Sequence, residues 1–455
     1  MRLVLWAASA LITMITSTTA SRCLAALGDD SRDAFVRVEG SQFLLAGKPY
    51  HYVGTNFWYG MNLASAGAGG DQARLRREFD HLQTLGVTNL RIMASSEGPN
   101  TAPYRMRPAL QSAPGIYDEQ IFRGLDLLLV EMRQRGMRGV LCLSDFWQWS
   151  GGFPQYVSWA EGGSAIPYPD HGDWDRFEKY SARFYVNSKA KAYYDAFVDK
   201  VVGRVNSLTG QAYRDDPTIM AWQLANEPRG MDHPLEFVQW VKDSSNRIRS
   251  LDHNHLISTG SEGSTPSDYA NTLPEVIHAL PNIDYLTFHI WIQNWGWYDP
   301  QRTDTYSPSL SLAHDYITAH VAIAERLHKP AVLEEFGIAR DQGSFQPAAT
   351  THQRDAYYRD IFSTVYASTS AGSALNGVNF WAWAGEGRPV HVGGTWQPGD
   401  AWIGDPPHEP QGWYSVYNED VGTIAIIRDY ARAMQQVQPI KEAHPLHGPR
   451  RPVNH

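Results

Sequence analysis

Short apolar runs alternate with longer amphipathic segments along most of the chain. Eight of these runs hold five to eight residues each and are rich in aliphatic and aromatic side chains. Runs of this length, bounded by glycine, proline or polar residues, are typical of buried β-strands. The predicted strands are His51–Trp58, Thr88–Met93, Arg138–Leu143, Ile219–Asn226, His255–Gly260, Ile283–His289, Ala331–Glu335 and Gly377–Trp381.

The segments between the runs carry apolar residues at three- and four-residue spacing, which predicts helices. The clearest are Asp71–Leu85, Glu119–Arg135, Ser188–Asn206, Leu235–Leu251, Ser311–Leu327 and Thr351–Thr369. Two of them stop at a glycine, Gly86 and Gly136, just before the next strand. Eight βα units in one chain predict an α/β fold of the closed (β/α)8 TIM-barrel type rather than an open doubly wound sheet.

The two ends of the chain differ from this pattern. Residues 1–20 combine an early arginine, an apolar stretch and small residues, which predicts a secretory signal peptide. Residues 21–34 are expected to be a connector, and residues 35–50 to form a small β-hairpin that caps the bottom of the barrel. The barrel domain is expected to span residues 35–440, followed by a disordered tail over 441–455, rich in Pro, His and Arg.

Composition narrows the function. The net charge of −9 argues against a nucleic-acid partner, whose binding needs a basic surface. No later apolar run approaches the roughly 20 residues of a membrane span. Aromatic residues make up 12% of the chain, with 16 Trp, which favours a carbohydrate groove, although an aromatic-rich core is an equal alternative for any one of them. The only cysteines, Cys23 and Cys142, are not expected to form a disulfide.

Polar and aromatic residues gather at the predicted strand ends. In (β/α)8 barrels the chemistry sits at the carboxyl ends of the strands, so these residues should share one rim. In chain order the ends carry Asn56 with Trp58, Arg91, Asp145 with Trp147, Asn226 with Glu227, Glu262, His289 with Trp291, Glu335, and Trp381 with Trp383.

Two glutamates on this rim suggest paired acid/base chemistry. Pro228 ends regular structure directly after Glu227, and Glu335 closes the run Ala331–Glu335. Glycoside hydrolysis needs one carboxylic acid to protonate the leaving oxygen and one carboxylate to attack the sugar or activate water. A separation of about 5 Å would mean retention, and roughly 6.5–9.5 Å would mean inversion. A structural ion pair with a barrel arginine is the alternative for either residue alone, and only one of Glu334 and Glu335 can face the cleft.

The motifs around these glutamates resemble glycoside hydrolase family 5, and specifically its β-mannanase branch (subfamily 7-like). The resemblance rests on Trp222–Arg229, which reads Trp-Gln-Leu-Ala-Asn-Glu-Pro-Arg, and on Glu335–Gly337, which reads Glu-Phe-Gly. Residues 204–210 and 405–412 add to it, and the likeness covers roughly residues 35–434.

The resemblance implies a retaining mechanism with Glu227 as acid/base and Glu335 as nucleophile. It also implies that Arg91 and His289 serve the nucleophile. Asn226 would touch the sugar 2-hydroxyl. The expected substrate-binding residues are Trp58, Arg91, Asn226, Arg229, His289, Trp291 and Trp381, with Trp381 as the floor of the cleavage subsite and Arg229 on the leaving-group side.

Two positions depart from the family pattern. Many members have a Tyr two residues after the sixth-strand His, where this chain has Trp291, so the role of Trp291 is open. Many also carry a His at the end of the third strand, where this chain has Ser144 and Asp145. No metal site is expected, because the sequence shows neither a His-x-x-x-His pair nor a Cys/His cluster, and no cofactor is needed.

The leading hypothesis is a secreted, monomeric endo-β-1,4-mannanase, extracellular or periplasmic, acting on mannan, glucomannan or galactomannan. An exo-acting mannosidase or mannobiohydrolase is the main alternative, because the long insertions at residues 145–180 and 385–414 could close one end of the groove. A cellulase and a non-catalytic carbohydrate-binding barrel are weaker alternatives.

Overall fold

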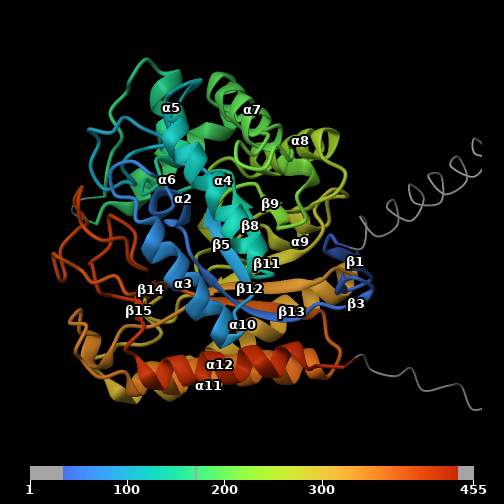
Figure 1. Ribbon diagram of the computed structural model, residues 1–455, viewed down its shortest axis with the longest axis vertical. Coiled ribbons are helices and arrows are strands. Elements are labelled where there is room, and N and C mark those ends of the chain that lie inside the picture. The colour runs from blue at the N-terminus through green and yellow to red at the C-terminus, as the bar shows by residue number, and fades with distance from the viewer. Residues whose placement is uncertain (1–33, 170–171, 439–455) are drawn as a thin grey trace, which may run out of the picture.

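The structure is a computed structural model that describes residues 34–169 and 172–438. The predicted signal peptide, nearly all of the connector and the predicted tail lie outside the described residues. Eight parallel strands form the central sheet, and helices surround it (Figure 1). The strands are β4 (Tyr52–Asn56), β5 (Asn89–Met93), β8 (Arg138–Cys142), β9 (Ile219–Gln223), β10 (Leu256–Ser258), β11 (Leu286–Ile290), β12 (Ala331–Phe336) and β13 (Leu375–Phe380). All eight predicted strands are therefore present.

The strands follow the order β10-β9-β8-β5-β4-β13-β12-β11. Chain neighbours are therefore sheet neighbours, and β13 returns to pair with β4, as a (β/α)8 barrel requires. β10 and β11 form no regular ladder, but backbone bonds from Asp284 N to Ile257 O (2.8 Å) and from His289 N to Glu262 O (3.0 Å) join their segments. The predicted barrel fold is confirmed, with its weakest seam between β10 and β11.

Helices lie around the barrel and in the connections that rise over one of its ends. They are α2 (Gly60–Leu63), α3 (Gln72–Leu85), α4 (Glu119–Gln134), α5 (Gly152–Ala160), α6 (Trp174–Ala182), α7 (Ser188–Val202), α8 (Pro234–Leu251), α9 (Pro274–His278), α10 (Tyr306–Leu327), α11 (His352–Ser370) and α12 (Val421–Gln435). Asp71 caps α3 by accepting from the N–H of Arg74 at 2.9 Å, and Gly86 ends it in the left-handed region with φ of 86°. No described helix is long and apolar enough to cross a bilayer.

The segment before the barrel forms three short antiparallel strands, one more than the predicted hairpin. They are β1 (Arg37–Glu39), β2 (Gln42–Leu45) and β3 (Lys48–Pro49). Val36 and Phe43 from this segment are buried together with barrel residues such as Val140, Met220 and Val332. The sheet thus closes the amino-terminal end of the barrel, as predicted, and leaves the opposite end free for a site.

Two long βα connections rise over that opposite end. The connection after β8 contains α5 and α6, and the one after β13 contains β14 (Trp383–Gly385) and β15 (Val416–Tyr417). A two-stranded sheet of β6 (Gln111–Ala113) and β7 (Ile116–Tyr117) follows β5. Short 3-10 turns complete the fold at Arg183–Val186, Tyr213–Asp215, Asp268–Ala270, Thr303–Thr305 and Asp341–Gly343.

Candidate active site

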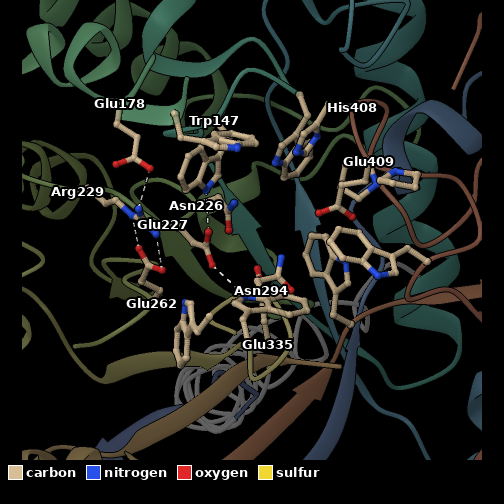
Figure 2. A pocket seen from close by; sticks show the side chains of 18 residues that line it. Trp147, Glu178, Asn226, Glu227, Arg229, Glu262, Asn294, Glu335, His408 and Glu409 are labelled. Carbon is tan, nitrogen blue, oxygen red and sulfur yellow. Dashed lines mark hydrogen bonds and ion pairs between the residues drawn. The ribbon is translucent and has the colours of Figure 1, made fainter. Parts of the chain in front are cut away.

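A cavity of about 490 Å³ opens at the carboxyl ends of the strands. Indoles, carboxylates and amides dominate its wall, and Figure 2 shows them pointing inward from all sides. The lining residues are Trp147, Trp149, Trp174, Glu178, Asn226, Glu227, Arg229, Glu262, Trp291, Asn294, Trp295, Glu335, Trp381, Pro406, His408, Glu409, Pro410 and Trp413.

Glu227 and Glu335 meet inside this cavity, although they are far apart in the sequence. Glu335 lies on β12, and Glu227 follows β9 with a positive φ of 48°, an uncommon conformation for a residue other than glycine. Such local strain is typical of functional sites. A carboxylate oxygen of each lies within 4.8 Å of the other and of a ring nitrogen of His289. This spacing fits the retaining geometry and is too short for the inverting one.

Arg91 holds Glu335. Its Nη1 contacts Oε1 of Glu335, its Nη2 donates to Oδ1 of Asn226 at 2.7 Å, and its Nε donates to Oε1 of Gln223 at 2.7 Å. Burial raises the pKa of Glu335 to about 7, although the charges of His289 and Arg91 oppose that change. The neighbouring Glu334 points away from the cavity and accepts from Nε2 of Gln223 at 2.7 Å. Of the two adjacent glutamates, Glu335 is the one that faces the cleft.

Three N–H groups surround Glu227. The indole of Trp147 donates to Oε2 at 2.7 Å, Nδ1 of His289 lies 2.6 Å from Oε1, and the indole of Trp291 donates to Oε1 at 3.4 Å. Burial raises the pKa of Glu227, but the bond and charge of His289, the charge of Arg229 and the indole of Trp147 outweigh burial and lower that pKa to about 2. Trp291, which replaces the usual Tyr, therefore faces the predicted acid/base.

His289 lies between the two carboxylates. Its Nδ1 is 3.4 Å from Oε2 of Glu335, farther than from Glu227. Burial lowers the pKa of His289, but the negative charges of Glu335 and Glu227 prevail and raise it to about 9. The protonation states of Glu227, His289 and Glu335 are therefore coupled. A proton on the imidazole can pass directly to Glu227, because their atoms lie 2.6 Å apart. The resemblance implies that His289 serves the nucleophile, and its ring also contacts the predicted acid/base.

Arg229 organises one end of the cavity. It donates two hydrogen bonds to Glu262, at 2.6 and 2.9 Å, and one to Glu178 at 3.0 Å. Its guanidinium also lies over the Trp147 ring, 4.8 Å from the ring centre. Burial raises the pKa of Glu262 to about 7 even though Arg229 lowers it. Carboxylates and a guanidinium held this way can bind sugar hydroxyls on the side of the acid/base.

The connection after β13 forms the other end of the cavity. His408 and Glu409 lie there, across the catalytic pair from Arg229 (Figure 2). Nδ1 of His408 and Oε2 of Glu409 are buried and have no hydrogen-bond partner among the described residues. Asp405 fixes this loop by accepting from the N–H groups of Gly412 and Tyr414 at 2.8 and 2.6 Å. The unpartnered atoms are available to a polar ligand.

Most of the predicted substrate-binding residues reach the cavity. Its lining includes Asn226, Arg229, Trp291 and Trp381. Two more predicted residues, Arg91 and His289, contact Glu335 and Glu227 without lining the cavity themselves. Trp58 does not, because its indole is 2% exposed, donates to the carbonyl of Gly404 at 2.9 Å and packs against Trp149.

Several lining residues were not among the predicted site residues. The clearest are Trp147, Glu178, Glu262, His408 and Glu409. Trp147 and Glu262 were marked only as residues at strand ends, and for the other three the length of the two insertions was the available signal. Their side-chain directions depend on how the insertions fold, which periodicity does not specify.

Glu227, His289 and Glu335 are also the described group whose ligating atoms lie close enough to hold a metal ion. Arg91 already pairs with Glu335 in this group, so a divalent cation would compete with that guanidinium. The arrangement fits proton transfer and nucleophilic attack without requiring a metal.

Comparisons with known proteins place this geometry in context. A family model described as GH family 5 beta-mannosidase-like matches residues 33–439. Mannan endo-1,4-beta-mannosidase 7 of Arabidopsis thaliana is 32% identical over 371 residues, which are 78% of this chain and 79% of that protein. Mannan endo-1,4-beta-mannosidase 1 of Oryza sativa subsp. japonica is 34% identical over 367 residues, 76% of this chain and 78% of that protein.

A solved structure is also similar over nearly the whole chain. The glycoside hydrolase family 5 mannosidase from Rhizomucor miehei is 40% identical, with a TM-score of 0.83, and the match covers 90% of this chain and 99% of that chain. A Glu-to-Ala mutant of the Rhizomucor miehei mannosidase has been solved in complex with mannosyl-fructose.

Proposed function

This chain belongs to the β-mannosidase-like group of glycoside hydrolase family 5, and we propose that it is a secreted retaining enzyme that hydrolyses β-1,4-mannosidic bonds. The observation that carries the proposal is the pair of carboxylates, Glu227 and Glu335, within 4.8 Å of one another in a cavity rich in indoles. The names of the two plant relatives specify mannan, and glucomannan and galactomannan are expected substrates beside it.

In the first step a carboxylate oxygen of Glu335 attacks the anomeric carbon. The bond from that carbon to the glycosidic oxygen breaks. Glu227, which its low pKa leaves ionised, takes a proton from His289 across their 2.6 Å contact and gives it to that oxygen, so the leaving sugar departs as an alcohol. The indole N–H of Trp147, 2.7 Å from Oε2 of Glu227, stabilises the carboxylate that forms as the proton leaves. The product is a covalent glycosyl-enzyme on Glu335.

In the second step Glu227 removes a proton from water and returns it to His289, and the water oxygen attacks the same carbon. The bond to Glu335 breaks, and the freed sugar keeps its original configuration because the centre has been inverted twice. Arg91 stabilises the departing carboxylate of Glu335, with which it is paired. Trp381 lines the cavity and offers an apolar face to the sugar ring.

We propose endo action as the primary mode, because the curated relatives are mannan endo-1,4-beta-mannosidases. One observation favours the alternative, an exo-acting mannosidase. His408 and Glu409 stand across one end of the cavity with buried atoms that have no partner, and these atoms could bind the terminal hydroxyls of a chain that ends there.

Two assays test the proposal. Release of reducing ends from galactomannan, glucomannan and carboxymethylcellulose, measured side by side, should be substantial for the mannans only. Activity on carboxymethylcellulose alone would indicate a cellulase, and binding to mannan without any release would indicate a non-catalytic barrel. The products of mannohexaose then separate the modes, because early appearance of internal fragments supports endo action, whereas release of single mannose units alone excludes it.

A further inference from the structure

A buried carboxyl group beside the catalytic pair has no part in the steps above. Asp145 follows β8 and is 0% exposed. In the sequence it stands out as a polar residue at a strand end and, with Ser144, as a departure from the family pattern. It neither lines the cavity nor forms an ion pair with a described residue.

One oxygen of Asp145 accepts hydrogen bonds from two residues of the active site. Oδ1 accepts from Nδ2 of Asn226 at 3.1 Å and from the backbone N–H of Trp147 at 3.1 Å. The backbones also adjoin, since Asp145 and Asn226 form an isolated parallel β-bridge and the N–H of Phe146 donates to the carbonyl of Asn226 at 3.0 Å. The carboxyl group therefore sits where the ends of β8 and β9 meet.

The two donors lead to different catalytic contacts. Asn226 accepts from Nη2 of Arg91 at 2.7 Å, so the bond to Asp145 fixes which way the amide faces, with its oxygen toward Arg91 and its nitrogen toward Asp145 and the cavity. The backbone bond to Trp147 sets the start of the turn from which the indole reaches Oε2 of Glu227. Oδ1 of Asp145 thus orients both the amide of Asn226 and the residue Trp147, whose indole donates to Glu227.

We propose that Asp145 is a positioning residue for the hydrolytic reaction, which orients Asn226 and Trp147 through its Oδ1 atom. The inference rests on the proposed function, since it assigns Asn226 to the sugar 2-hydroxyl and Glu227 to the leaving oxygen.

The chemistry of the site agrees with a neutral acceptor. Burial raises the pKa of Asp145 well above its usual range, and the negative charges of Glu227 and Glu97 add to this effect. Its second oxygen, Oδ2, has no hydrogen-bond partner among the described residues and can carry the proton. An uncharged Asp145 holds its two N–H donors without adding a third negative charge beside Glu227 and Glu335.

Three variants separate orientation from mere packing. Asp145→Asn keeps an acceptor oxygen and no charge, so its kcat/KM should stay within about threefold of the wild type. Asp145→Leu keeps the volume and removes the acceptor, and the resulting misplacement should lower kcat/KM by about 10²-fold. Glu97→Leu is the matched control, because Glu97 is also 0% exposed and also accepts a backbone N–H from the same connection, that of Gly152 at 2.7 Å, but touches no catalytic group.

The decisive readout is the dependence on substrate. Each variant is assayed on 4-nitrophenyl β-mannoside, its 2,4-dinitrophenyl counterpart and a 2-deoxy analogue, or on the corresponding mannobiosides if the wild type needs two sugar units. The dinitrophenolate leaves without a proton, so a defect at Glu227 costs less there, and the 2-deoxy sugar lacks the hydroxyl that Asn226 would contact. The loss caused by Asp145→Leu should therefore shrink at least tenfold on one of these two substrates, whereas any loss caused by Glu97→Leu should be equal on all three.

Equal losses on all substrates, or an unchanged kcat/KM, would overturn the inference. Failure of the wild type to cleave any β-mannoside would instead overturn the proposed function, so the two failures are distinguishable. If circular dichroism shows that Asp145→Leu does not fold, Asp145→Ser replaces it, because a hydroxyl on the shorter side chain cannot reach both N–H groups.

Discussion

The buried Glu97 allows a quantitative prediction about pH and stability. Its side chain is enclosed beside the active-site connection, with Oε2 accepting the N–H of Gly152 and Oε1 lacking a partner among the described residues. Burial raises its pKa from 4.5 to about 7. A carboxyl group whose pKa is raised on folding stabilises the protein fully below its unfolded pKa, and that contribution is lost as the pH rises through the folded pKa.

The size of the effect follows from the pKa change. A rise of about 2.5 corresponds to about 3 kcal/mol of stability lost between pH 4.5 and pH values above 7. Glu97→Gln cannot titrate and resembles the protonated acid, so it should not lose this contribution. With an unfolding entropy of about 2.1 cal/mol/K per residue over roughly 400 ordered residues, 3 kcal/mol corresponds to about 4 °C in Tm.

The assay is thermal unfolding of the wild type and Glu97→Gln at pH values from 4 to 8. The Tm difference, variant minus wild type, should be near zero at pH 4 and increase to about 4 °C at pH 8. Activity at pH 6 should be unchanged, which verifies a native fold. Parallel Tm curves over the whole range would refute the reasoning, because they would mean that Glu97 titrates as it does in the unfolded chain.

Three further predictions concern the reaction. Glu227→Ala should lower kcat/KM on mannan by about 10²–10⁴-fold but have a smaller effect on 2,4-dinitrophenyl substrates, and a uniform loss in steady-state kinetics would argue against its role as the acid. Trp381→Ala should raise KM for manno-oligosaccharides, since it removes an apolar face worth about 1 kcal/mol or more, and an unchanged KM would place the sugar elsewhere. Glu409→Ala should lengthen the products of mannohexaose if this residue closes one end of the cavity, and an identical product profile would show that it does not.

The barrel was predictable because its determinants are local. Eight apolar runs and the helical periodicity between them specify βα units, and proximity of successive units leaves the closed barrel as the simplest arrangement. Glu227 and Glu335 were also predictable, because parallel strands bring their carboxyl ends to one rim. Their separation within 4.8 Å could not be read from the sequence, since it depends on register and on the unusual backbone of Glu227.

The rest of the site depends on long connections without periodic patterning. Trp147 and Asp145 lie in a turn whose shape is set by contacts with the neighbouring strand end, and Glu409 lies in a loop held by buried Asp405. Trp58 was predicted to bind substrate, but it lies in the core. A strand-end indole can equally pack inward, and this one donates a hydrogen bond to the carbonyl of Gly404. Side-chain direction in such segments follows from tertiary packing rather than from local spacing.

The most direct test of the account is covalent trapping of the nucleophile. A 2-deoxy-2-fluoro-β-mannosyl fluoride, or the matching mannobiosyl fluoride, should form a glycosyl-enzyme that hydrolyses slowly enough for peptide mass spectrometry. We expect one fluorosugar on the peptide that contains Glu335, and none in Glu335→Ala. A label on any other residue, or cleavage of mannan without a trappable intermediate and with inverted product configuration, would contradict it.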